Sequence, residues 1–227
     1  RLPNCVRLKS RQKLMAMHIG KNSFEEGISE RELEDIGEPL DIEDLLAFNP
    51  KEDPNQLIGE RRWICKGATC VWIGPSGVGK STLTMQAAIA WGLGRSFFGM
   101  APKKPLRSLI IQAENDSGDI AEMVQGVLEG MGISVFDDEI EQIKNNVLPL
   151  QDSSHTGNGF ARVLLRLINR YKPDLVWIDP LLSFIGGDIS KQEVCSEFFR
   201  KTLNPILHST GVALMCIHHT GKPPRER

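Results

Sequence analysis

Residues 69–82 have the sequence TCVWIGPSGVGKST. They contain the pattern Gly-x-x-x-x-Gly-Lys-Ser, which is typical of a P-loop. Glycines let the backbone N–H groups of such a loop turn inward and form a concave site for an anion. At this spacing the lysine reaches the β- and γ-phosphates of a nucleotide, and the serine hydroxyl is a ligand for Mg²⁺. The predicted nucleotide cradle is Gly74, Pro75, Ser76, Gly77, Val78, Gly79, Lys80, Ser81 and Thr82.

The sequence on either side of this loop supports the same interpretation. Residues 70–73 are a short apolar run and predict a buried strand, and the Ala- and Leu-rich residues 82–93 predict a helix. A helix that starts at the loop directs its positive N-terminal end at the bound phosphates. A glycine-rich turn that binds nothing is the less favoured alternative.

The composition is that of an ordinary globular protein. The chain has 227 residues, of which 41% are hydrophobic and 25% charged, and its net charge is -2. There is no global basic field of the kind that attracts nucleic acid, although a local basic site remains open. Five scattered cysteines suit free thiols in a reducing compartment, and we expect a cytoplasmic protein without a membrane span. Cys65 and Cys70 are the one close pair and have no second pair to complete a zinc site.

Charge changes abruptly along the N-terminal part of the chain. Residues 1–21 carry six basic side chains and no acid, whereas residues 22–53 carry twelve acids and two basic side chains. Such a switch indicates an appendage outside the main core. We expect an appendage and linker over residues 1–55 and the main core, which carries the predicted nucleotide cradle, over residues 56–227. The basic start is read as a solvated face in preference to a contact with a phosphate backbone.

Two short helices are predicted in the appendage. Ser29 and Glu32 have the spacing of a capping box. Asp41 is the N-cap expected for a second helix, whose apolar face would be formed by Ile42, Leu45 and Leu46.

Beyond the P-loop, apolar runs alternate with helical patterns, and proline or glycine lies at the joints. This alternation predicts an α/β fold with a parallel sheet. Strands are expected at 106–113, 147–150, 175–179 and 211–217, and helices at 118–130, 159–171 and 192–203, the last of them stopped before Pro205.

Polar residues follow several of these strands. Glu114 comes directly after the second predicted strand, Asp179 ends the strand LVWID, and His218 and His219 follow the last strand. Because ligands bind at the carboxyl ends of parallel strands, we expect these side chains to meet the P-loop at one edge of the sheet. Asp179 has the form of a Walker B acid, which approaches Mg²⁺ usually through water, although an aspartate that caps the turn before Pro180 is the alternative.

The chain resembles the RecA-like ATPases, and in particular the RepA-type hexameric replicative helicases and related phage and plasmid ATPases. The resemblance covers roughly residues 56–222 and rests on GPSGVGKST, QAEND, LVWIDPL and HHTGK, in the family's order and spacing. It implies a RecA-like P-loop NTPase with a mainly parallel central sheet, in which the last strand lies between the P-loop strand and the Walker B strand.

The resemblance also implies roles for single residues. Glu114 matches the glutamate that polarises the attacking water, and Asp179 matches the Walker B acid. His218 or His219 matches the residue that senses the γ-phosphate. Neighbouring strand residues face opposite sides, so only one of them can do this, and the spacing to Lys222 favours His219.

The function that follows is Mg²⁺-dependent ATP hydrolysis, coupled to single-stranded DNA in a homo-oligomeric ring or filament, as in a helicase for DNA replication or a recombination motor. An ATP-gated scaffold or regulator is the main alternative, and a small-molecule kinase is a weaker one. RecA-like domains usually continue past HHTGK, so we expect the chain to be part of a longer protein. Lys222, Arg225 and Arg227 are candidates for a cation that completes the site of a neighbouring subunit.

Overall fold

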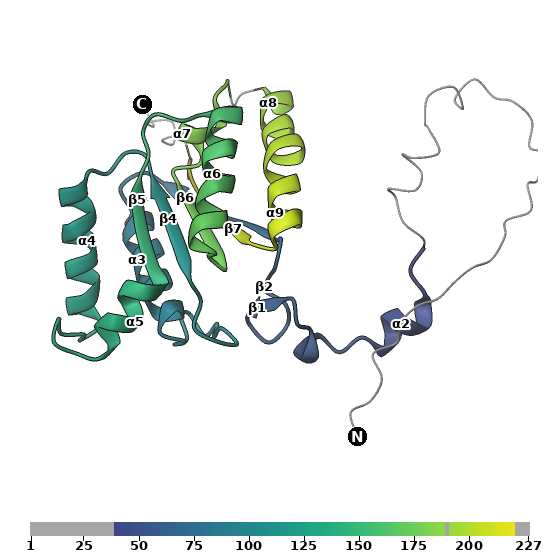
Figure 1. Cartoon of the computed structure of the whole chain (residues 1–227), viewed down its shortest axis with the longest axis horizontal. Coiled ribbons are helices and arrows are strands. Elements are labelled where there is room, and N and C mark those ends of the chain that lie inside the picture. The colour runs from purple at the N-terminus through teal and green to yellow at the C-terminus, as the bar shows by residue number, and fades with distance from the viewer. Residues whose placement is uncertain (1–38, 189–190, 221–227) are drawn as a thin grey trace, which may run out of the picture. The chain divides into compact units, whose positions relative to one another are not determined.

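The computed structural model of the chain describes residues 39–188 and 191–220. The chain divides between Phe48 and Asn49 into two units. The second unit is built on a five-stranded parallel sheet with the order β3-β7-β6-β4-β5 (Figure 1). The strands are β3 (Thr69–Pro75), β4 (Ser108–Gln112), β5 (Val147–Gln151), β6 (Leu175–Asp179) and β7 (Ala213–Thr220). The predicted α/β fold is confirmed, and β7 lies between the P-loop strand and β6 as expected.

Helices cover both faces of this sheet (Figure 1). The helices α3 (Lys80–Gly92), α4 (Ser117–Gly130) and α5 (Glu139–Asn146) pack on one face, around apolar residues such as Met85 and Ile110. The helices α6 (Gly157–Tyr171), α7 (Leu182–Ile185), α8 (Gln192–Glu197) and α9 (Asn204–Thr210) pack on the other. The sheet thus separates two apolar cores, one on the side of α3 and one on the side of α6. Alternate residues of each inner strand point into different cores. The same alternation decides which polar side chains at the strand ends face α3.

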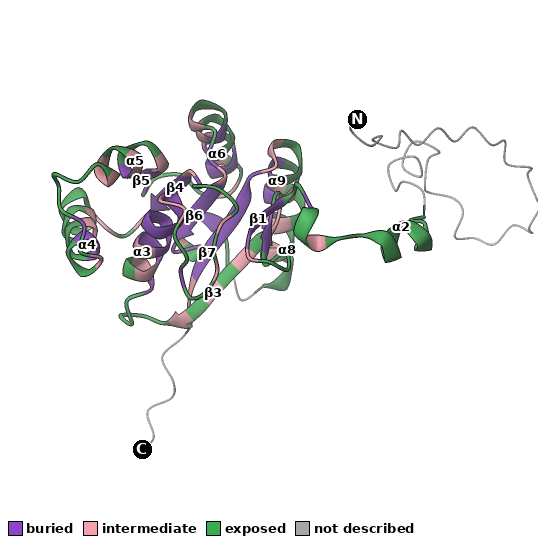
Figure 2. Ribbon diagram, turned by 90° about the horizontal axis from the view of Figure 1, so that it is seen from below, coloured by how far each residue is buried: buried purple, intermediate pink, exposed green. Residues whose placement is uncertain are grey.

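The P-loop strand β3 lies at the edge of the sheet. Its residues alternate between exposed and half-buried, whereas β6 is buried throughout (Figure 2). Cys70 and Trp72 pack against the core on the α3 side. Val71 and Ile73 point to the opposite face and are exposed. Among the described residues, β7 is the only strand that pairs with β3.

A small antiparallel hairpin precedes β3 and was not predicted from the sequence. It consists of β1 (Gln56–Ile58) and β2 (Ile64–Cys65), which form a separate two-stranded sheet. Buried Asp53 forms an ion pair with Arg62 in the turn of the hairpin. Lys103 donates hydrogen bonds of 2.9 Å to the carbonyls of Lys51 and Asp53, so the 3₁₀ turn at Pro50–Glu52 (η1) is held to the loop that follows α3.

The helix predicted to stop before Pro205 continues beyond it, and this part of the prediction was wrong. After α8 the chain forms a π-helix, η2 (Phe198–Leu203), which leads into α9 and ends at Thr210. Proline has no N–H to donate to the carbonyl four residues earlier, which is why it usually ends a helix. Here the N–H of Asn204 bonds to the carbonyl of Phe199, five residues back, so the bonding pattern has already changed when the chain reaches Pro205.

The helix predicted after Asp41 is present as α2 (Ile42–Ala47). The Asp41 carboxylate accepts a 2.7 Å hydrogen bond from the N–H of Glu43, which confirms the N-cap. Ile42, Leu45 and Leu46, which form its predicted apolar face, are all exposed. Residues 1–21 and the capping box at Ser29 and Glu32 lie outside the described residues.

Two further observations concern the chain as a whole. No helix in the described ranges is long and apolar enough to cross a membrane. Cys65, Cys70, Cys195 and Cys216 are free thiols, and Cys5 lies outside the described residues.

All four tryptophans form one connected aromatic cluster. The ring of Trp177 in β6 lies 5.3 Å from Trp72 in β3 and 5.8 Å from Trp91 in α3, and Trp91 lies 6.0 Å from Trp63 in the hairpin. The indole N–H groups of Trp177 and Trp91 donate to the Ser108 hydroxyl and the Met100 carbonyl. The cluster therefore joins the P-loop strand, the P-loop helix and the strand that ends at Asp179.

We expect Trp177→Ala to lower the free energy of unfolding by about 3–5 kcal/mol, because it opens a cavity among fully buried rings. Trp63→Ala is the matched control. Trp63 is 42% exposed, so its loss should cost clearly less. Urea unfolding followed by circular dichroism measures both, and equal losses would show that Trp177 is not central to the packing.

Candidate nucleotide site

The P-loop has the backbone geometry that a phosphate cradle needs. Gly77 and Gly79 have φ angles of +79° and +85°, which side-chain-bearing residues rarely adopt, and an added Cβ at either would meet no atom within 4 Å. Glycine is therefore required here by backbone conformation rather than by crowding. Lys80 is buried, and its Nζ donates to the carbonyls of Gly74 at 2.9 Å and Pro75 at 2.5 Å.

The first turn of α3 presents free donors to this cradle. Gly79 is the N-cap and supplies no side-chain hydrogen bond, and the first turn contains no acid. The positive end of the helix is therefore left for an external anion. Ser81 is half-buried, whereas Thr82 and the loop residues Pro75, Ser76 and Val78 are exposed.

The register of the parallel strands brings the predicted polar residues to one edge. Gln112 of β4 pairs with Asp179 of β6, and Gly74 of β3 pairs with His219 of β7. Glu114 follows Gln112 by two residues, and its charge acts on Asp179. The sequence-based expectation that the P-loop, Glu114, Asp179 and a histidine meet at the carboxyl edge thus agrees with the described geometry.

The Asp179 carboxyl is buried at the centre of this group, with 2% of the residue exposed. Burial raises its pKa above the usual range, and the nearby Glu114 carboxylate acts in the same direction. Hydrogen bonding by the Ser81 hydroxyl, the charge of His219 and the Gln112 side chain oppose this rise in pKa. Ser81, Asp179 and His219 are therefore neighbours, although they come from three different elements.

Strand alternation separates the two histidines. In β7, Met215 and Ile217 belong to the core on the α3 side, whereas Leu214 and Cys216 belong to the opposite core. His219 continues the first series and faces the P-loop helix, and His218 continues the second and faces away. His219 is thus the histidine beside Asp179.

Comparison with known proteins agrees with this geometry. A family model described as "AAA domain" matches residues 31–225. The chain belongs to this AAA domain family. A search of curated proteins found no match to the chain. Membership of this family implies nucleoside-triphosphatase activity, without specifying the nucleotide or the biological role. Such activity typically requires Mg²⁺.

Several buried polar atoms of this AAA domain lack hydrogen-bond partners among the described residues. They include Asp179 Oδ2, Thr84 Oγ1, His219 Nδ1, and both Oε1 and Nε2 of Gln112. Such atoms are rare in native structures and call for water, an ion or a ligand. A free carboxylate oxygen and a hydroxyl are the ligands that Mg²⁺ prefers, so these residues fit the cation. Ser81 and Asp179 are the residues that would hold it.

The sequence analysis missed Gln112. Gln112 is the first residue of QAEND, but the resemblance gives it no role, and its burial and its unpartnered amide atoms became evident only in the structure. Asp116 is the N-cap of α4 and forms a reciprocal capping box with Asp119, so its carboxylate is used by the helix that follows Glu114. Lys222, Arg225 and Arg227 lie outside the described residues.

Asp179→Asn should raise the thermal stability of the nucleotide-free AAA domain at pH 8. The pKa of Asp179 is higher in the folded state than in the unfolded state, so the folded protein holds this proton more tightly. The contribution of Asp179 to stability is therefore full below the unfolded pKa and is lost as the pH rises through the folded pKa. Asparagine cannot ionise, and the gain should therefore shrink as the pH approaches about 4, the unfolded pKa of aspartate. Scanning calorimetry across this range provides the measurement, and an aspartate more stable than asparagine at pH 8 would contradict the assignment.

Proposed function

We propose that the chain hydrolyses ATP by the attack of water on the γ-phosphate. In this proposal Lys80 neutralises charge on the β- and γ-phosphates, and Ser81 and Asp179 hold Mg²⁺. Glu114 accepts the proton of the attacking water, and His219 senses the γ-phosphate. When bound, Mg²⁺ supplies positive charge that stabilises the transferring phosphoryl group.

The convergence of these residues at one sheet edge carries the proposal. Asp179 is close enough to both Ser81 and Glu114 for each to change its pKa, and it comes from a strand that is separate from both. Lys80 lies one residue before Ser81, and its ammonium group is held at the mouth of the loop by two carbonyls. Incoming phosphate oxygens would replace these carbonyls as acceptors, so the lysine requires little rearrangement to bind nucleotide.

Glu114→Gln should retain ATP binding in the presence of Mg²⁺ and hydrolyse ATP at least ~100-fold more slowly, because it keeps the shape of glutamate but loses the base. Binding is measured by calorimetry and turnover by phosphate release. Lys80→Ala is the comparison, since it should lose turnover through weaker contact with the phosphates rather than through loss of the base. Wild-type turnover by Glu114→Gln would assign the base to another residue.

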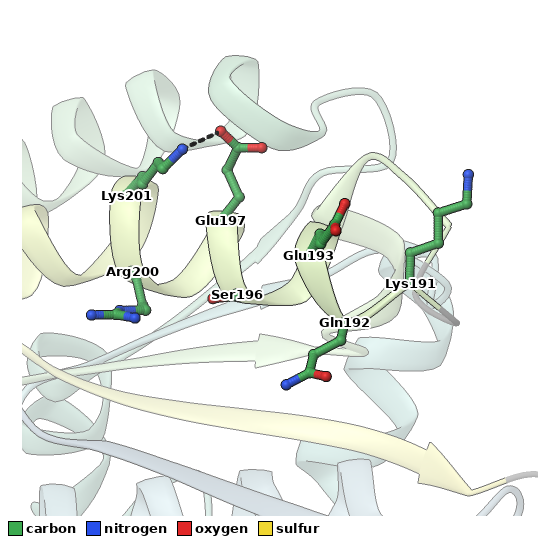
Figure 3. Close-up of a pocket in the computed structure, with 7 residues that line it drawn as sticks. All are labelled: Lys191, Gln192, Glu193, Ser196, Glu197, Arg200 and Lys201. Carbon is green, nitrogen blue, oxygen red and sulfur yellow. Dashed lines mark hydrogen bonds and ion pairs between the residues drawn. The ribbon is translucent and has the colours of Figure 1, made fainter.

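We further propose that hydrolysis is coupled to single-stranded DNA in a homo-oligomeric ring or filament. The motif order shared with RepA-type helicases supports this proposal. A cavity of about 1030 Å³ lies along α8 and η2. These elements come after the Walker B strand β6 in the chain, and this position also supports the proposal. The residues that line the cavity are Lys191, Gln192, Glu193, Ser196, Glu197, Arg200 and Lys201 (Figure 3).

The basic side chains of this cavity differ in their pairing. Lys201 forms a 3.2 Å ion pair with Glu197. Lys191 and Arg200 form no ion pair with another described residue, and Arg200 extends from the side of the helix opposite to Lys201 (Figure 3). Unpaired cations at such a cavity suit the phosphates of a nucleic acid strand.

Arg200→Glu should reduce the stimulation of ATP hydrolysis by single-stranded DNA, expressed as the ratio of the rates with and without DNA. Arg166→Glu, an equal charge reversal on the exposed side of α6, is the control and should leave the ratio unchanged. Because contacts with phosphate release counterions, wild-type stimulation should also fall as salt is raised.

An ATP-gated scaffold without strand separation is the alternative. It would hydrolyse ATP at a rate that DNA does not change, while assembly, followed by light scattering, would depend on ATP. We also propose that Lys222, Arg225 or Arg227 supplies the cation that completes the site of a neighbouring subunit in a ring. ATP hydrolysis per subunit that is independent of protein concentration would count against such a shared site.

A further inference from the structure

Gln112 is a fully buried polar residue whose amide atoms form no hydrogen bond of normal geometry in the described part of the chain, although its side chain lies close enough to Asp179 to lower the pKa of that carboxyl. It is the last residue of β4 and has no exposed surface. Neither its amide oxygen nor its amide nitrogen has a hydrogen bond to another described residue. An amide that is buried and unpaired costs stability, on the order of 1–3 kcal/mol for each polar group. An apolar residue would avoid this cost, so the position calls for an explanation beyond packing.

The surroundings of Gln112 are those of the nucleotide site. In the sheet it pairs with Asp179 on one side and with Gln151 on the other. Ile110 and Trp177, two residues before Gln112 and Asp179, both belong to the core on the α3 side. By strand alternation Gln112 and Asp179 therefore point to the same face, on which α3 carries Ser81.

Gln112 and Asp179 have complementary unpartnered atoms on this face, one a hydrogen-bond donor and the other an acceptor. Asp179 Oδ2 is a buried acceptor without a donor, and Gln112 Nε2 is a buried donor without an acceptor. Of the unpartnered atoms of Gln112 and Asp179, Gln112 Oε1 then remains, and it can accept from a water molecule. Buried water typically makes about three hydrogen bonds to such groups.

We infer that Gln112 is a positioning residue for the Mg²⁺ site. Its amide N–H orients the Asp179 carboxylate, and its carbonyl oxygen accepts a hydrogen bond from a water on the cation. Residues that orient metal ligands in this way typically change metal affinity by ~10–100-fold when they are replaced. This inference rests on the proposed hydrolytic site and adds to it a residue outside the P-loop and Walker B motifs.

Glutamine is suited to this position because one side chain offers a donor and an acceptor. A glutamate would place a second negative charge beside Asp179, and a methionine of similar length offers neither hydrogen bond. Gln112→Met therefore removes the hydrogen-bonding function while keeping most of the volume. Gln151→Met is the matched control, since Gln151 is the neighbour of Gln112 in the sheet but is exposed.

The experiment measures binding of a non-hydrolysable ATP analogue by calorimetry, as a function of Mg²⁺ concentration, for the wild type and both variants. In Gln112→Met the Mg²⁺ concentration at half-saturation should rise by about tenfold or more, while binding of the analogue without Mg²⁺ stays the same. Gln151→Met should follow the wild type. The melting temperature of nucleotide-free Gln112→Met should equal or exceed that of the wild type, because an unpaired amide has been removed.

The outcomes separate this inference from the proposed function. If the wild type shows no Mg²⁺-dependent binding of the analogue, the hydrolytic site itself is wrong. If the wild type shows it and Gln112→Met matches the wild type, Gln112 is not a positioning residue. A lower melting temperature together with weaker binding at every Mg²⁺ concentration would indicate a packing role instead and would also overturn the inference. Should Gln112→Met not fold, the smaller apolar variant Gln112→Leu takes the same test.

Discussion

The pairing of β6 between β4 and β7 buries the Asp179 carboxyl at the end of a fully covered strand, and one of its oxygens has no described partner. A buried charge without a partner is costly in a protein interior. The side chains nearby do not remove this cost, because burial still raises the pKa of Asp179 despite Ser81 and His219. A divalent cation at this point would offset the charge. With the proposed Mg²⁺ site, this arrangement would lower the stability of the empty domain and raise its affinity for the cation.

An apolar cluster packs below the buried Asp179 carboxyl. Trp177 lies two residues before Asp179, and its ring contacts both Trp72 of the P-loop strand and Trp91 of the P-loop helix. Large aromatic rings contribute much buried area, and their edge-to-face contacts have defined geometry. The P-loop strand β3, the helix α3 that supplies Lys80 and Ser81, and the strand β6 that supplies Asp179 are thus fixed to one another below the site rather than within it. Polar residues at the edge can then remain unpaired until a ligand binds.

The sequence predicted the elements whose patterns are local. The strand before the P-loop, the helix after it and the LVWID strand each follow from a few adjacent residues, and the structure contains all of them. The β1–β2 hairpin was missed because strands of three and two residues carry no periodicity. The helix through Pro205 was ended too early, since the π-helical turn before the proline depends on packing of Phe198 and Leu203 in the core. Gln112 gave no signal, because a glutamine at the end of an apolar run becomes unusual only when its burial and its neighbours are known.

The position of β3 at the edge gives β7 a particular importance. Within the described part of the chain β3 pairs with β7 alone, along all seven of its residues from Thr69 to Pro75. The last of these pairs join Gly74 and Pro75, whose carbonyls hold Lys80, to His219 and Thr220. The strand that carries the histidine beside Asp179 is therefore also the strand that positions the P-loop. A shift of His219 towards a bound γ-phosphate would move the end of β7, and the continuous hydrogen-bonded register would pass this movement to the P-loop without an intervening loop.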